Sequence, residues 1–243
     1  MTDFTIWQDD PFILAQADII LQYAEWTNDD PFFVADKVSN ARKIIKDDYE
    51  RLGDKFYTES NAYIYDNMAA NPTIGVRANL INKFIPDGIK RIKDHPGKTF
   101  ADFGAGIGVM CELATKLGKE TTHIDLPSYS TEFAWWRNKK LNLNIFFQEI
   151  SENDFTLHEQ YDIIFTDAVW EHLPPNKQIS YARQLAQYVT PGGMLYFLVD
   201  LSGVNPDMPM HYDCDINKVH HALSEHLVCE YGLNTFASVW YNR

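Results

Sequence analysis

The stretch that decides the fold is Asp102-Phe103-Gly104-Ala105-Gly106-Ile107-Gly108. It follows a short apolar run at residues 99–103 and opens a helical pattern at residues 107–117. Glycines let the backbone turn sharply and approach a ligand closely. A loop of this kind lies at the carboxyl end of a strand, where open α/β sheets bind their ligands. We therefore expect a ligand site at this loop.

The spacing of the glycines indicates which ligand. A nicotinamide or flavin fingerprint reads G-x-G-x-x-G, and its third glycine would fall on Val109. Here Gly108 comes one residue earlier, which gives acid-x-G-x-G-x-G with Asp102 as the acid. A carboxylate suits a cation better than a phosphate. S-adenosylmethionine carries an ammonium and a sulfonium and no phosphate, so the loop favours this ligand over a dinucleotide.

From Pro96-Gly97 onwards, short apolar runs alternate with helical patterns. This alternation predicts a mainly parallel sheet with right-handed crossovers. Residues 232–234 alone separate the last two runs, so these should form an antiparallel hairpin. The expected strands are residues 99–103, 121–126, 144–148, 161–165, 194–199, 227–231 and 235–240. The expected helices are residues 107–117, 128–140, 175–189 and 215–225.

Residues 1–95 have helical patterns throughout. Asp9-Asp10-Pro11-Phe12 and Asp29-Asp30-Pro31-Phe32 are both start signals, in which an Asp caps the helix and a Pro occupies its first turn. Residues 94–97 are the whole connection to the first strand, which is too short for a free tether. We therefore expect a helical cap at 1–95 that packs on a Rossmann-like domain at 96–243.

The composition limits the partners. With 21 Lys and Arg against 34 Asp and Glu, the net charge of -13 repels nucleic acid. Neither a secretory leader nor roughly 18 consecutive apolar residues is visible, which argues against secretion and membrane insertion. Cys111, Cys214 and Cys229 are far apart and odd in number, as in a reducing compartment. We expect a cytoplasmic protein with a small-molecule substrate, and the oligomeric state stays open.

Three further segments accompany the glycine loop. Asp125 ends the second expected strand, 17 residues after Gly108, where a carboxylate can accept hydrogen bonds from both ribose hydroxyls. Residues 161–173 form a fourth strand and its loop, and residues 189–195 lead into a fifth. In this order and spacing, residues 100–197 resemble the class I S-adenosylmethionine-dependent methyltransferases.

The resemblance implies an α/β fold with seven strands, mostly parallel and ending in an antiparallel hairpin, and S-adenosylmethionine as cofactor. It places Asp102 near the methionine ammonium, the glycines under the cofactor and Asp125 at the ribose. Glu149 and Ile150 replace the usual acid-then-small pair at the adenine. The implied cofactor residues are Asp102, Gly104, Ala105, Gly106, Gly108, Asp125, Leu126, Glu149, Ile150 and Asp167.

Aromatic side chains crowd the cap near Phe56, Tyr57, Tyr63 and Tyr65. Such a stripe is usually core, but aromatic faces also hold a sulfonium cation well. We expect at least one tyrosine to act as a lid over the methionine end. The candidate catalytic residues are Tyr63, Tyr65, Asp167, Trp170 and His172.

Two of these candidates have plainer interpretations. His172 suits a general base at neutral pH, but a tether in which Glu171 and His172 begin a helix and hydrogen-bond the loop is favoured. Trp170 could line the pocket or pack in the core.

The segment Met210-His211-Tyr212-Asp213-Cys214-Asp215 raises the question of a metal. Its possible ligands are mixed, and no second cluster stands ready to complete a shell. We therefore expect no metal, but a substrate-side loop with Asp215 capping the next helix. His220, His221 and His226 are interpreted as surface or helix positions.

Three functions fit these features. The leading one is methyl transfer to an oxygen, nitrogen or carbon of a metabolite in specialised metabolism. A second is cyclisation of the cofactor itself to azetidine-2-carboxylate and methylthioadenosine, by enzymes that this chain resembles in size and in its aromatic cap. The third is a cofactor-binding protein without turnover.

Overall fold

The computed structural model describes residues 11–70, 72–151, 155–204 and 206–243. Asp9 and Asp10 of the first expected start signal lie outside these ranges, and its Pro11 is the first residue of the first described helix. The second is confirmed: Asp30 caps its helix by accepting a hydrogen bond from the backbone N of Phe32 at 2.8 Å.

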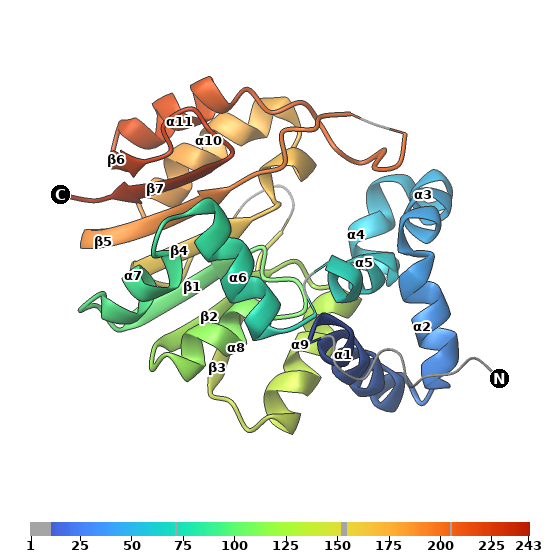
Figure 1. Ribbon diagram of the computed structural model, residues 1–243. Coiled ribbons are helices and arrows are strands. Elements are labelled where there is room, and N and C mark those ends of the chain that lie inside the picture. Colours follow the sequence, from blue (N-terminus) through green and yellow to red (C-terminus); the bar gives the residue numbers. More distant parts are fainter. Residues whose placement is uncertain (1–10, 71, 152–154, 205) are drawn as a thin grey trace.

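The centre of the molecule is a seven-stranded sheet with the order β3-β2-β1-β4-β5-β7-β6 (Figure 1). Strand β7 pairs antiparallel with both β5 and β6, and the other pairs are parallel. This confirms the predicted sheet and its terminal hairpin. The strands are β1 (Thr99–Phe103), β2 (Glu120–Asp125), β3 (Ile145–Glu149), β4 (Tyr161–Asp167), β5 (Val189–Leu198), β6 (Val228–Tyr231) and β7 (Ala237–Tyr241).

Helices cover both faces of the sheet. On one face, α10 (Pro175–Ala186) and α11 (Ile216–Ser224) bury Leu185 and Leu223 against strand residues such as Ile164. On the other face, α8 (Val109–Lys116) contributes Met110 and Leu113 to a second cluster. Helix α9 (Tyr129–Lys140) lies between the sheet domain and the N-terminal helices.

Two helices that the sequence assigned to the cap belong to this second face. These are α6 (Ile74–Phe84) and α7 (Gly88–Asp94). Their residues Ile81 and Ile92 are buried in one cluster with Phe165 of the sheet. In terms of packing, the cap therefore ends before α6 and not at residue 95. The apolar stripe of α6 covers the sheet, which a helical period alone does not reveal.

The cap consists of α1 (Pro11–Thr27), α2 (Pro31–Ser39), α3 (Ala41–Leu52), the 3-10 turn η2 (Gly53–Lys55), α4 (Phe56–Glu59) and α5 (Ala62–Ala70). Figure 1 shows these helices in blue and cyan beside the sheet domain. Their core extends into that domain, because Ile19 and Met68 share a buried cluster with Ile107 and Phe133. The cap and the sheet domain thus share a buried hydrophobic cluster.

Within the described residues, the structure contains no helix with the length and apolar character needed to span a bilayer.

Candidate active site

The glycine loop after β1 is held in a conformation that only glycine adopts easily. Gly104, Gly106 and Gly108 have φ values of 78°, 54° and 76°, in the left-handed region. A Cβ on Gly104 would also collide with Cγ2 of Val169, which follows β4. The loops after β1 and β4 therefore touch, as expected at the carboxyl edge of a parallel sheet.

Two side chains of β2 hydrogen-bond the backbone N and O of Gly106. Asp125 Oδ2 accepts a hydrogen bond from Gly106 N at 2.6 Å, and His123 Nε2 lies 2.9 Å from Gly106 O. From the cap, the Asn67 side chain lies over the same residue, 3.6 Å from the place of a Cβ on Gly106. A bulkier residue at this position would therefore meet the cap as well as any ligand.

Asp102 ends up inside the molecule, with only 2% of its surface exposed. Burial raises the pKa of its carboxyl to about 7; Arg77 opposes this, and the carboxylates of Asp125 and Asp167 add to it. Cys111 Sγ lies 3.6 Å from Asp102 Oδ2. A buried carboxyl among other carboxyls is a place where a cation would be bound favourably.

The ends of β2 and β3 meet beside the loop. Leu126 N donates to Asp125 Oδ1 at 2.7 Å, and Ile150 N donates to Asp125 O at 2.9 Å. Burial raises the pKa of Asp125, and nearby His123 opposes it. Glu149 is exposed and Ile150 is partly buried against the core. The expected ribose and adenine residues are thus neighbours, with Asp125 at the centre.

Asp167, at the end of β4, is paired with Arg77, which the sequence did not indicate as a site residue. Arg77 of α6 donates to Asp167 Oδ2 at 2.5 Å, and its guanidinium lies 5.3 Å from the centre of the Phe165 ring. Among the described residues, Arg77 Nε is buried without a hydrogen-bond partner. A lone arginine in a helical pattern carries no signal in the sequence, because the pairing with Asp167 joins residues 90 positions apart.

The loop after β4 is tied to the cap through His172. Its Nε2 lies 2.7 Å from the hydroxyl of Tyr63, and its Nδ1 lies 3.0 Å from that of Tyr57. Burial, with nearby His211, holds the pKa of His172 well below its usual range. The residue sits in a 3-10 turn, η3 (Trp170–His172). The structure thus agrees with the tether interpretation and places both tyrosines against this loop.

Two candidates from the sequence are core residues instead. Trp170 is fully buried, and its indole Nε1 donates to Gln178 O at 3.0 Å. Tyr65 is 1% exposed and packs edge-on against Tyr23 in the cap, with the hydroxyls 3.5 Å apart. Their burial agrees with the core interpretation, and a catalytic role for either residue stays a prediction. On α5, Tyr63 faces the loops while Tyr65 faces the interior of the cap.

Of the two positions expected for His220, surface or helix, the structure shows the helix, because His220 lies in α11. It is 1% exposed, and its Nδ1 accepts from Asn234 N at 2.8 Å. The expectation that no second cluster stands ready to complete a metal shell with the 210–215 segment does not hold. Glu171, His172 and His211 offer ligand atoms that all lie within 4.8 Å of one another. Asp215 caps α11 as predicted, accepting from Lys218 N at 3.2 Å.

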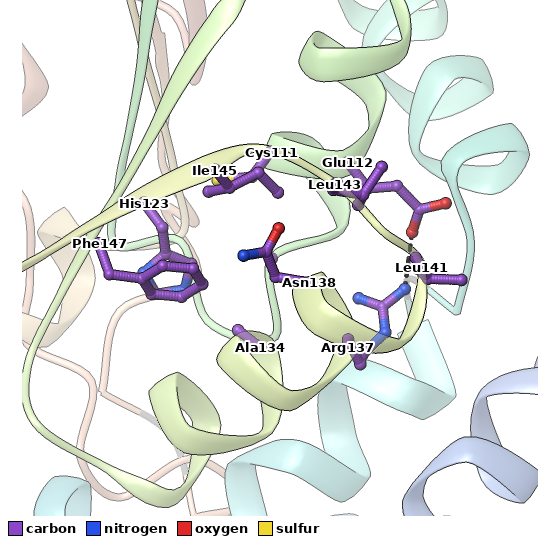
Figure 2. Close-up of a pocket in the computed structure, with 11 residues that line it drawn as sticks. Cys111, Glu112, His123, Ala134, Arg137, Asn138, Leu141, Leu143, Ile145 and Phe147 are labelled. Atoms are coloured by element: carbon purple, nitrogen blue, oxygen red, sulfur yellow. Dashed lines mark hydrogen bonds and ion pairs between the residues drawn. The ribbon is translucent and has the colours of Figure 1, made fainter.

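A small cavity lies behind the glycine loop, between α8, α9 and the strands β2 and β3. Figure 2 shows the stacked rings of His123 and Phe147 at one end and the ion pair of Glu112 with Arg137 at the other. Its volume of about 10 Å³ suits one water molecule and not a cofactor. This cavity is therefore too small to be the cofactor site.

Comparison with known protein families gives a match over the sheet domain. A family model described as "Methyltransferase domain" matches residues 77–240, which is more than half of the chain. The chain belongs to this family. The match begins within α6, so it includes Arg77 and leaves out the cap.

Curated relatives match a shorter part. A ubiquinone biosynthesis O-methyltransferase from Bordetella avium is 29% identical over 104 residues, 42% of each chain. One from Proteus mirabilis is 29% identical over 103 residues, 42% of this chain and 41% of the relative. The chain thus matches about two fifths of the length of these relatives.

Solved structures share the fold at low identity. An O-methyltransferase family protein from Burkholderia thailandensis has a TM-score of 0.57 at 12% identity, covering 84% of this chain and 70% of the other. The PH0226 protein from Pyrococcus horikoshii has a TM-score of 0.54 at 13% identity, covering 80% and 98%. Both support the Rossmann-like methyltransferase fold.

Class I methyltransferases use S-adenosylmethionine, and the residues at the carboxyl edge fit this cofactor. The positive-φ glycines give the loop a tight turn at the carboxyl end of β1, the edge where an open α/β sheet binds its ligand. Asp102 offers a buried carboxyl to an ammonium, and Arg77 offers an unpartnered buried Nε to a carboxylate, within the part of the chain that is described. One acidic and one basic side chain therefore match the two charges of an amino-acid moiety.

Proposed function

We propose that this protein transfers a methyl group from S-adenosylmethionine to a hydroxyl oxygen of a small molecule. The observation that carries the proposal is the position of the cap, which touches the loops after β1, β4 and β5. The Asn67 side chain lies over Gly106, and the Tyr63 hydroxyl forms a hydrogen bond with His172. Phe56 shares a buried cluster with Met210. An acceptor held between the cap and these loops has to be small.

The cofactor is proposed to lie across the glycine loop. Asp125 has lone pairs beyond those used by Gly106 and Leu126, and these would accept hydrogen bonds from the ribose hydroxyls. Asp102 would face the ammonium. Arg77 would bind the carboxylate of the methionine moiety while Asp167 keeps its guanidinium in place.

The acceptor is proposed to lie beside Tyr57, Tyr63 and His172. When bound, the cofactor supplies a methyl group on a sulfonium that is already a good leaving group. What the chain adds is alignment of the acceptor oxygen with that methyl group and exclusion of water by the cap. The net charge of -13 favours a neutral or cationic acceptor over a nucleic acid. The relatives' names support oxygen as the methylated atom.

Incubation with S-adenosylmethionine, with and without a panel of phenolic and other hydroxylated metabolites, tests the proposal. We expect adenosylhomocysteine and an O-methylated product only when an acceptor is present. Methylthioadenosine formed without acceptor would show cyclisation instead. Cofactor binding without any product over a broad panel would show a protein without turnover.

A matched pair of variants tests the acceptor site. Tyr63→Phe removes the hydroxyl that lies 2.7 Å from His172, whereas Tyr65→Phe removes one that contacts Tyr23 inside the cap. We expect Tyr63→Phe to lower kcat about tenfold or more, and Tyr65→Phe to leave it within about twofold. Equal effects would contradict the placement of the acceptor. Deletion of residues 1–70 should abolish turnover, because it removes the cap.

A further inference from the structure

Glu171 and His172 come together with His211, which lies 39 positions after His172 in the chain. Strands β4 and β5 are parallel neighbours, so the loops that follow them meet at one edge of the sheet. The two loops are also joined directly, because Tyr212 N donates to Glu171 O at 2.6 Å. The backbones of the two loops are therefore held together at the cluster.

The ligand atoms of the three side chains lie within 4.8 Å of one another. Two buried atoms of this set have no hydrogen-bond partner among the described residues, namely Glu171 Oε2 and His211 Nδ1. Glu171 is 1% exposed and His211 is 4% exposed. Buried polar atoms are almost always satisfied, so unpartnered ones that converge on one point indicate a missing ligand.

The surroundings favour a cation at that point. Asp200 Oδ2 lies 3.9 Å from His211 Nδ1, too far for a hydrogen bond but close enough to add negative charge. The Tyr57 hydroxyl lies 3.0 Å from Nδ1 of His172, and a metal on Nε2 would replace the Tyr63 hydroxyl, which lies 2.7 Å from that nitrogen. Histidines that bind metals are commonly oriented through their second nitrogen in this way.

We propose that Glu171, His172 and His211 bind a divalent transition-metal ion of the zinc type. Two histidines and one carboxylate are the protein ligands of open catalytic zinc sites, and related metals accept the same set. The remaining position would be available to an oxygen ligand, because the site lies in the same loops where the acceptor is proposed to bind. The metal site itself does not depend on the proposed methyl transfer.

Metal titration of the untagged full-length protein, stripped with chelator and dialysed, tests this site. We expect one equivalent of Zn²⁺ to bind, and Co²⁺ to give the visible absorption of a low-symmetry nitrogen–oxygen site. His211→Gln and Glu171→Gln should each weaken Zn²⁺ binding on the order of 100-fold or more. His221→Gln, on the exposed face of α11, is the matched control and should bind as the original protein does.

Circular dichroism and adenosylhomocysteine binding report whether each variant is folded. Should Glu171→Gln fail to fold, His211→Gln decides alone. No stoichiometric Zn²⁺ or Co²⁺ binding by the original protein, or unchanged binding by a folded His211→Gln variant, would overturn the proposal and leave the cluster as a tether of the cap. Because the readout is metal binding alone, this result is independent of whether methyl transfer is found.

Discussion

Asp102 allows the sharpest test of the site, because its environment makes a quantitative statement about stability. It is 2% exposed, and burial raises its pKa from 3.8 to about 7, with Arg77 opposing the increase. In the unfolded chain the carboxyl ionises near pH 3.8. Between these values the folded protein holds a proton that the unfolded chain has lost. The proton therefore favours the folded state most at low pH.

As the pH rises from about 4 to about 7, the stabilisation that this proton gives to the folded state is lost, and the free energy of unfolding falls. The difference between 3.8 and about 7 corresponds to up to about 4 kcal/mol of unfolding free energy. Asp102→Asn keeps the shape of the side chain but cannot ionise. We therefore expect the cofactor-free variant to gain stability over the original protein as the pH rises, by up to about 4 kcal/mol at pH 8.

Urea unfolding at a series of pH values measures this gain as the difference between the two proteins. Asp162→Asn is the matched control with the opposite sign. Burial pushes the pKa of Asp162 up, but hydrogen bonds from Thr99, Thr190 and Lys98 outweigh it and lower the pKa below 3.8. That variant should be less stable than the original protein above pH 4. A stability difference for Asp102→Asn that stays constant from pH 4 to pH 8 would refute the reasoning.

The stabilised Asp102→Asn variant should also bind the cofactor less well. An amide does not attract an ammonium, and losing a charge-assisted hydrogen bond costs about 1.5–3 kcal/mol, or one to two decades in affinity. Calorimetry with adenosylhomocysteine measures it. Greater stability together with weaker binding distinguishes a residue kept for its ligand from one kept for packing.

Three further substitutions probe the same edge of the sheet. Asp125→Ala should weaken cofactor binding by about 1.5–3 kcal/mol and loosen the glycine loop, and unchanged affinity in calorimetry would contradict its proposed role at the ribose. Gly104→Ala should lower the unfolding free energy by more than Gly118→Ala does. Both glycines have positive φ, so an alanine costs about 1–2 kcal/mol at either position, but only at Gly104 does its Cβ meet Val169. Equal losses in urea unfolding would argue against that contact. Arg77→Ala should cost about 2 kcal/mol of stability and weaken adenosylhomocysteine binding at least tenfold, and calorimetry showing normal affinity would remove Arg77 from the site.

Much of the sheet domain could be predicted because its signals are local. The apolar run at β1, the glycines after it and Asp125 stand close together in the chain, and each reports the backbone that it needs. The short 232–234 connection allowed only a hairpin, and β6 and β7 form one. In these segments the pattern of a few neighbouring residues determines the element, and the order of the elements determines the topology.

The face that each helix presents was not predictable in the same way. Tyr63 and Tyr65 belong to one helix, and two residues lie about 200° apart around its axis, so they point in different directions. The sequence does not say which direction leads to the ligand loops. Trp170 and His172 differ likewise: one is fully buried and the other faces the cap.

The sequence by itself determined the class of the fold, the place of the glycine loop and the acidic residues at the ends of β1 and β2. Only the tertiary structure brought Arg77 to Asp167 across 90 residues, and His211 to His172. These pairs form because parallel strands place all their carboxyl ends at one edge, where loops and cap helices from distant parts of the chain converge. Contacts of that kind depend on how whole elements pack, and packing is set by the shapes of buried surfaces that no local pattern contains.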